Sequence, residues 1–127
     1  MLMVYKDRKH KRSKSYLDSF SHAIHGFKTA FLEERNMRFH LVATLFVILC
    51  GFFFHITKSE WLLLLLVICL VIALELVNTA IERAVDVATK EFLPEAKKAK
   101  DVAAAAVLLA SLFSVIIGLI IFIPYVF

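Results

Sequence analysis

Long apolar runs alternate with short polar segments along this chain, and their spacing predicts four helices. In the first, large apolar residues recur every three or four positions from Leu17 to Phe31, which keeps them on one helix face. Polar residues occupy the other faces. Such a helix is suited to lying in the membrane interface, although the same face would also pack against protein. The pattern predicts an amphipathic interfacial helix over residues 15–33.

Three longer apolar runs follow, and each is long enough to cross a bilayer as a helix. They predict membrane helices over residues 37–56, 61–88 and 102–123. Trp61 opens the second of these runs, at the position of an interfacial anchor. The expected fold class is an all-α membrane protein, with one interfacial helix and three transmembrane helices in a single domain over residues 1–127.

The segment between the last two apolar runs is expected to be a loop over residues 89–100, with Pro94 as its breaker. Asp101 has the position and the side chain of an N-cap for the last helix. That helix is expected to end at Pro124, because proline has no backbone N–H group to donate.

Small residues recur at every fourth position of the last helix, at Ala106, Ala110, Ser114 and Gly118. Small residues at this spacing let two helix backbones approach closely in lipid. The high helix propensity of alanine is the simpler explanation of the alanine run, but the stripe continues beyond it. We therefore expect a close helix contact along this stripe, which also fits self-association of the chain.

The composition excludes an ordinary soluble domain, because 61% of the residues are hydrophobic and the mean hydropathy is +0.79. Residues 1–14 are strongly basic and carry much of the net charge of +4. We expect them to form a tail on anionic lipid head groups and no nucleic-acid site, because nothing downstream suits nucleic acid. A mixed amphipathic stretch follows them in place of a compact apolar core with a small-residue cleavage site, so a cleaved signal peptide is not expected. Cys50 and Cys69 lie inside apolar runs and are expected to be buried free thiols.

The basic residues also predict an orientation. Lys and Arg concentrate in residues 6–38 and 83–100, whereas the turn at 55–60 has only Lys58. The positive-inside rule therefore places the N-terminus and the 89–100 segment on the cytoplasmic face of the cell membrane. The acidic segment around Glu34 then lies at the same depth as the polar end of the second membrane helix.

That polar end is the most informative stretch, residues 75–86, ELVNTAIERAVD. On a helix, Glu75, Asn78, Glu82 and Asp86 fall within an arc of roughly 80° on one face. Ionisable groups inside or beside a membrane segment are costly and usually mark a functional site. An ordinary helix end emerging into water would turn polar on all faces, and this one does not.

Clustered carboxylates at a membrane face suit a metal and phosphate site, because Mg²⁺ is usually held by one or two carboxylates plus phosphate oxygens. Lys100 can offset phosphate charge, and a further carboxylate can act as a base for a hydroxyl nucleophile. The chain has three glycines and no Gly-rich phosphate loop. A small proton-coupled transporter or a scaffold subunit would also carry such carboxylates.

Three motifs resemble those of the prokaryotic diacylglycerol kinase family: residues 26–38, GFKTAFLEERNMR; residues 75–86; and residues 99–107, AKDVAAAAV. They occur in order, within a similarity that covers about residues 19–125. The resemblance implies an interfacial helix and three membrane spans, assembled as a homotrimer with composite active sites. It also implies transfer of a phosphoryl group from ATP to a lipid alcohol.

The same resemblance implies roles for individual residues. Glu75 matches the family's proposed catalytic base, and Glu34 and Glu82 match glutamates that hold Mg²⁺ on the ATP phosphates. Both glutamates are therefore expected to lie against the nucleotide. The remaining matches are nucleotide-contacting or supporting polar positions of the same site: Lys100, Asp101, Asp86 and Asn78. The chain departs from the Gram-negative members at Ser15 and His22, where those members have an arginine and a tyrosine near ATP.

The first motif continues to His40 in a form, ERNMRFH, that resembles the Gram-positive branch of the family. Members of that branch are undecaprenol kinases. The resemblance therefore favours undecaprenol as the lipid alcohol, with diacylglycerol as the alternative.

Overall fold

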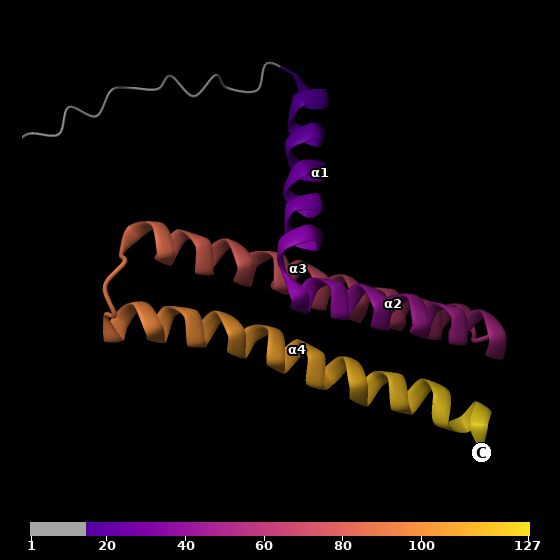
Figure 1. Ribbon diagram of the computed structural model, residues 1–127. Coiled ribbons are helices and arrows are strands. Elements are labelled where there is room, and N and C mark those ends of the chain that lie inside the picture. The colour runs from indigo at the N-terminus through magenta and orange to yellow at the C-terminus, as the bar shows by residue number, and fades with distance from the viewer. Residues whose placement is uncertain (1–14) are drawn as a thin grey trace, which may run out of the picture.

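The computed structural model describes residues 15–127, which form four helices without a strand in that range (Figure 1). The helices are α1 (Tyr16–Glu33), α2 (Arg35–Phe54), α3 (Lys58–Ala88) and α4 (Pro94–Val126). The predicted all-α class, with an N-terminal helix and three long apolar helices, is confirmed. The predicted basic tail, residues 1–14, lies outside the described residues.

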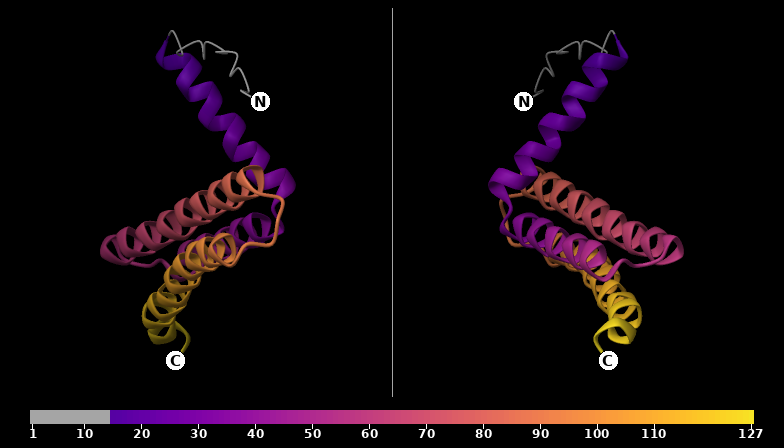
Figure 2. Two further views of the ribbon diagram at one scale, coloured as in Figure 1. Left: turned by 90° about the vertical axis from the view of Figure 1, so that its left-hand side faces the viewer. Right: turned by 90° about the vertical axis from the view of Figure 1, so that its right-hand side faces the viewer.

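By length and composition, α2, α3 and α4 are each able to cross a membrane. They run side by side, while α1 leads steeply away from them (Figures 1 and 2). Most large apolar side chains of the four helices are exposed on the single chain. Lipid or other protein must therefore cover them, because water would not tolerate so much contiguous apolar surface.

A single residue, Glu34, joins α1 to α2 in an extended conformation. Its N–H group donates to the carbonyl of Ala30, which closes the last turn of α1. The guanidinium of Arg38 donates to the carbonyls of Phe31 and Leu32, at 3.2 and 2.8 Å. These bonds satisfy carbonyls that a helix end otherwise leaves without partners. They also place the start of α2 directly beneath the end of α1.

The turn between α2 and α3 is tight because its two helix ends are capped. His55 ends α2 in the left-handed region, with φ of 53°. Thr57 and Glu60 then form a reciprocal capping box at the start of α3. Beside this turn, a Cβ atom at Gly51 would lie 2.6 Å from Cη2 of Trp61. Glycine is therefore what lets the indole ring pack against α2.

The predicted loop over residues 89–100 is confirmed only over 89–93 and is wrong over 94–100, because α4 begins at Pro94. A proline at the first helical position loses no bond and has a suitable φ, so it starts this helix where a breaker was expected. Asp101 consequently lies inside α4, where it pairs with Lys97, and does not cap it. The helix also continues past Pro124 to Val126, since only one backbone donor is lost there.

The contact between α3 and α4 buries one face of each helix. On α4 the buried side chains are Ala103, Val107, Ala110 and Ile121. The predicted small-residue stripe does not form one contact within the chain: Ala106 is exposed, and a Cβ atom at Gly118 would meet nothing within 4 Å. A spacing of four residues drifts about 40° per step around a helix, so the stripe leaves the contact face.

Both cysteines are free, as predicted. They are not both buried, however, since Cys50 is half-buried and Cys69 is exposed on the chain. Burial in protein was predicted because both cysteines have apolar neighbours in the sequence. On a membrane helix, however, a residue with apolar neighbours can also face the lipid.

Candidate active site

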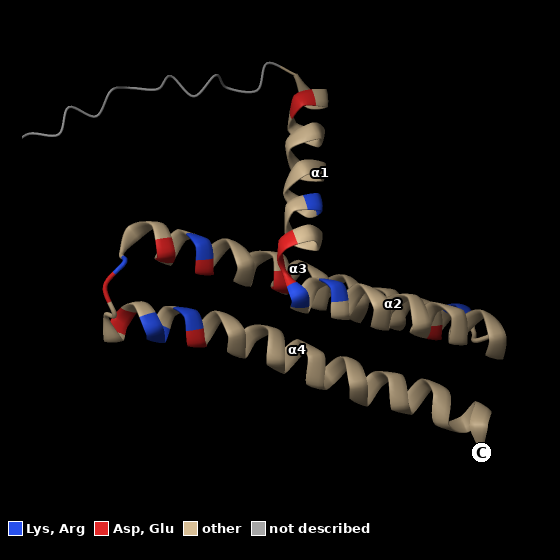
Figure 3. Cartoon of the chain, in the orientation of Figure 1, with Lys and Arg blue, Asp and Glu red and all other residues tan. Residues whose placement is uncertain are grey.

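Charged residues gather at one end of the helix bundle, around the second half of α3, the start of α4 and the junction of α1 with α2 (Figure 3). At the opposite end, the charged residues of α3 are Lys58 and Glu60. This distribution follows from the sequence, because α2 and α4 each place their apolar part toward that opposite end. The acidic residues around Glu34 and those of residues 75–86 therefore lie at the same end of the bundle, as predicted from their common depth in the membrane.

Glu75 is the deepest carboxylate of this cluster, with only 2% of its surface exposed. Oε2 of Glu75 lies 3.9 Å from Nε2 of His40 on α2. The charges of Glu82 and Glu34 also act on Glu75 across the site. The structure thus brings these three glutamates together, from α3 and from the α1–α2 junction.

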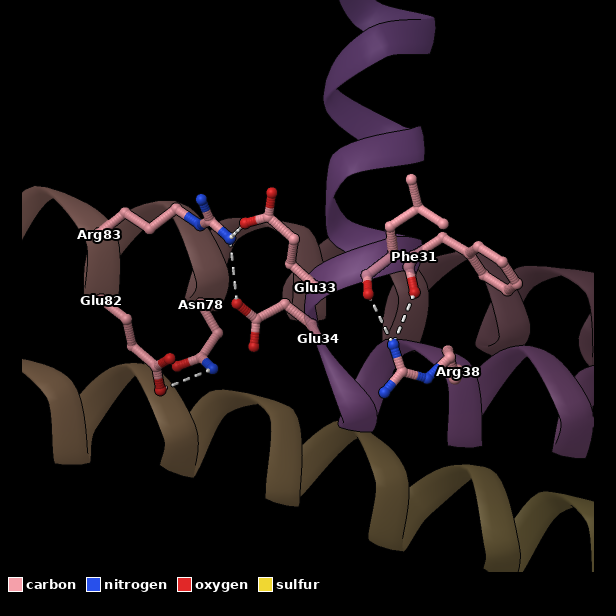
Figure 4. Close-up of polar contacts among 8 residues, drawn as sticks. Phe31, Glu33, Glu34, Arg38, Asn78, Glu82 and Arg83 are labelled. Carbon is pink, nitrogen blue, oxygen red and sulfur yellow. Dashed lines mark hydrogen bonds and ion pairs between the residues drawn. The ribbon is translucent and has the colours of Figure 1, made fainter.

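Asn78 links the buried part of the site to its open end. Its Nδ2 donates to Oε1 of Glu82 at 3.3 Å, one helical turn further along α3 (Figure 4). Asn78 is itself buried, and its Oδ1 atom has no hydrogen-bond partner among residues 15–127. A buried amide oxygen without a partner is costly, so it is available to a bound group.

Glu34 enters the site from the α1–α2 junction, held by Arg83 of α3. The Arg83 guanidinium donates to Glu33 and, at 3.3 Å, to Oε1 of Glu34 (Figure 4). Because these ion pairs are largely exposed, their main contribution is to position the side chains. Arg83 thereby fixes the end of α1 against α3.

Lys100 on α4 forms an ion pair with Asp86 on α3. The charge of Glu82 also acts on Lys100, so this lysine lies on the open side of the carboxylate cluster. Asp101 is placed differently: it is exposed and pairs with Lys97 on its own helix. Among residues 15–127, no side-chain hydrogen bond or ion pair joins Asp101 to the other candidate residues.

The carboxylates fit a magnesium ion that shares its coordination with phosphate. Among residues 15–127 there is no group of three or more His, Cys, Asp or Glu side chains able to enclose a metal ion. Mg²⁺ does not need such a cage, since it is commonly bound through one or two carboxylates plus phosphate oxygens and water. Glu34 and Glu82 each have one carboxylate oxygen bonded, which leaves the second oxygen for a ligand.

His40 and Arg83 are site residues for which the sequence predicts no role. Their contacts join helices and span 35 and about 50 residues of chain. Helix periodicity cannot reveal such pairs, because it relates only residues a few positions apart. The sequence did offer one indication of a role for them, because both residues lie within or close beside the first two family motifs.

The whole chain is similar to known lipid kinases. It matches the family described as prokaryotic diacylglycerol kinase over residues 21–122. It is 42% identical to an undecaprenol kinase of Bacillus subtilis over 122 residues, which are 96% of this chain and 98% of that protein. It is 43% identical to a diacylglycerol kinase of Synechocystis, over 80% of this chain and 59% of that protein. A diacylglycerol kinase of Helicobacter pylori is 42% identical over 69% of each chain.

These similarities cover all three motifs and the site built by α1 to α4. The resemblance indicated by the motifs is thereby confirmed, and the three apolar helices agree with a multi-pass membrane protein. The chain belongs to the prokaryotic diacylglycerol kinase family and is a membrane-embedded lipid kinase.

Proposed function

We propose that this chain transfers the γ-phosphoryl group of Mg·ATP to the hydroxyl of undecaprenol. The similarity to an undecaprenol kinase over nearly the full length of both chains carries the choice of lipid. The buried Glu75, close to Glu34 and Glu82, supports the choice of reaction. The transporter and scaffold alternatives have no comparable support, because the matching proteins are kinases.

In the proposed reaction, Glu75 is the general base. It accepts the proton as the lipid oxygen forms its bond to the γ-phosphorus, and the bond from phosphorus to the β-phosphate oxygen breaks to release ADP. Burial keeps water, a competing nucleophile, away from this carboxylate. The membrane-side position of Glu75 in the acidic stripe also suits a hydroxyl that arrives from lipid.

Glu34 and Glu82 are proposed to hold Mg²⁺ on the ATP phosphates. When bound there, the ion would neutralise charge on the phosphoryl group. Asn78 orients the Glu82 carboxylate through its 3.3 Å hydrogen bond. Lys100, Asp86 and Asp101 are proposed to contact the nucleotide. The Lys100–Asp86 pair must then open or be shared when the phosphates bind.

We further propose that the site faces the cytoplasm and that α1 lies in the membrane interface. The excess of Lys and Arg on the flanks nearest the site supports this orientation. The exposed apolar residues of α1, such as Phe20 and Ile24, support the interfacial position. Assembly as a homotrimer with composite sites rests on the family resemblance and would cover part of the exposed apolar surface.

Diacylglycerol is the second candidate substrate, because several similar proteins are diacylglycerol kinases. Both lipids present a hydroxyl beside apolar chains, so the same chemistry applies to each.

The test is an assay of purified protein in mixed micelles with labelled ATP and either lipid. We expect ADP release only with lipid and Mg²⁺ together, and a higher kcat/KM for undecaprenol. A preference for diacylglycerol would reverse the choice of substrate. ADP release without lipid, or proton flux without ADP in vesicles, would contradict the kinase proposal.

A further inference from the structure

The space between His40 and Glu75 has the dimensions of a hydroxyl-binding position. Nε2 of His40 and Oε2 of Glu75 lie 3.9 Å apart, which is too far for a direct hydrogen bond. A single oxygen atom beside the pair, at the apex of a triangle, can lie at about 2.8 Å from both atoms. Among residues 15–127, neither side chain makes a hydrogen bond. Both therefore have unused hydrogen-bonding capacity.

His40 also lines an apolar groove of about 430 Å³ between α2, α3 and α4. Along α2, His40 is the lining residue nearest the α1 junction, and along α3, Val71 is the lining residue nearest Glu75. The groove thus begins about one helical turn from Glu75 and runs toward the opposite end of the bundle. Its walls are apolar, with residues such as Val47, Leu64 and Phe122. Its volume is in the usual range for a small-molecule site.

We propose that the hydroxyl of the lipid alcohol binds between His40 and Glu75, with the adjoining apolar chain in this groove. The neutral imidazole of His40 donates its Nε2–H to the hydroxyl oxygen, and the hydroxyl donates its proton to Oε2 of Glu75. His40 is then a substrate-binding residue that fixes the attacking oxygen. This inference rests on the proposed function, because it assumes that Glu75 is the base.

The groove matters because Glu75 is buried. Glu75 is only 2% exposed, so a hydroxyl cannot reach it directly from the outer surface of the chain. The side chain of His40 is 16% exposed, lines the groove and is also near Glu75. The nearby arginines are engaged elsewhere, Arg38 with carbonyls of α1 and Arg83 with Glu33 and Glu34. His40 is therefore a donor that α2 places beside Glu75.

The test compares His40→Phe, which keeps a ring but loses the donor, with His40→Gln, which keeps an N–H donor of similar reach. His25→Phe, at an exposed position of α1, is the matched control. Each protein is assayed in mixed micelles with undecaprenol and Mg·ATP for kcat, for KM of each substrate and for thermal unfolding. We expect His40→Phe to lower kcat/KM for the lipid by about 10-fold or more, the worth of a hydrogen bond to a buried group. The KM for ATP should stay within about 2-fold, and His40→Gln should recover most of the loss.

Each outcome decides the proposal. Wild-type kcat/KM for the lipid in His40→Phe would overturn it while leaving the kinase proposal intact. An equal loss in both His40 variants, with lower thermal stability, would show a structural role and overturn it. A rise in the KM for ATP alone would place His40 on the nucleotide side. A wild-type protein without lipid-dependent ADP release would refute the proposed function, and this inference with it.

Discussion

In the proposed reaction, Glu75 acts about two helical turns away from the groups proposed to bind strongly hydrated ligands. The single stripe on α3 separates these tasks by depth, since Glu75 and Glu82 lie about 10 Å apart along the helix. The buried end suits a proton acceptor for a lipid hydroxyl, and the exposed end suits phosphate and metal. Glu75 and Glu82 are therefore expected to respond differently to the loss of their charge.

Glu75→Gln should lower kcat by about 10²-fold or more, the usual contribution of a positioned base. The amide keeps the shape of the side chain but cannot accept the proton. Nucleotide affinity should remain nearly unchanged, because the phosphates are proposed to bind nearer Glu82 and Lys100. Single-turnover rates and nucleotide binding measured on one preparation check this, with the exposed Glu95→Gln as the control. Poor ATP binding with normal turnover at saturation would instead make Glu75 a ligand.

Glu34→Gln and Glu82→Gln should each raise the Mg²⁺ concentration needed for half-maximal activity. A hard divalent ion loses a charged oxygen ligand in either variant. Magnesium titrations at saturating ATP and lipid provide the measurement, again with Glu95→Gln alongside. Titrations that match wild type in both variants would show that the ion binds elsewhere.

At this scale the sequence predicted the acidic residues well and their partners poorly. Glu75 and Glu82 were predicted to share one face of a helix, and Glu34 was predicted to lie at the same membrane depth. These two arguments were enough to predict that the three residues lie close together. His40 and Arg83 depend on how α2 and α1 pack against α3, which no local pattern encodes. Asp101 shows the opposite case, because its motif predicts a nucleotide contact and the structure pairs it with Lys97.

Among the elements, the turn from α2 to α3 depends on one close approach. The Trp61 ring lies beside the backbone of Gly51 and also contacts Phe52, with ring centroids 4.9 Å apart. The helices themselves were predictable here from the hydrophobic runs. Their ends were harder to predict, because Pro94 fits either a helix breaker or a first helical residue until the neighbouring residues are placed.

Gly51→Ala should reduce the free energy of unfolding by about 1–3 kcal/mol, because the new methyl group forces the indole ring out of its position. Trp61→Phe removes the two ring atoms concerned, so the double variant should lose less than the sum of the single changes. Thermal unfolding in mild detergent measures the set. Strict additivity would mean that the two residues do not compete for the same space.

The whole molecule has a well-defined site but leaves most of its apolar surface uncovered. On α2 and α4, little of the apolar segment is buried by the chain itself, and α3 is the most buried of the three. Lipid can cover this surface, but a stable membrane protein also gains from helix contacts between subunits. Sequence patterns predict such self-association without fixing its number, because they do not specify which exposed faces match.

Chemical cross-linking in mild detergent should give a ladder that stops at three subunits. The physical reason is that three copies, each with the family's helix arrangement, would form a closed assembly without free interfaces. Protein unfolded in a strong detergent should give only the monomer under the same conditions. A ladder that ends at two or four subunits, or does not end, would contradict the trimer.

The one-residue joint at Glu34 also sets how the chain tolerates insertions and deletions. From Ala30 to His40, each backbone position is fixed by a helical turn, by the Glu34 hydrogen bond or by Arg38. Adding or removing one residue within this stretch would turn the following helix by about 100°, which would carry His40 away from Glu75. The exposed loop at residues 89–93 is held mainly by hydrogen bonds between Thr89 and Glu91, so a change in its length should be tolerated better. The number of residues in the stretch from Ala30 to His40 therefore helps to set the distance between His40 and Glu75.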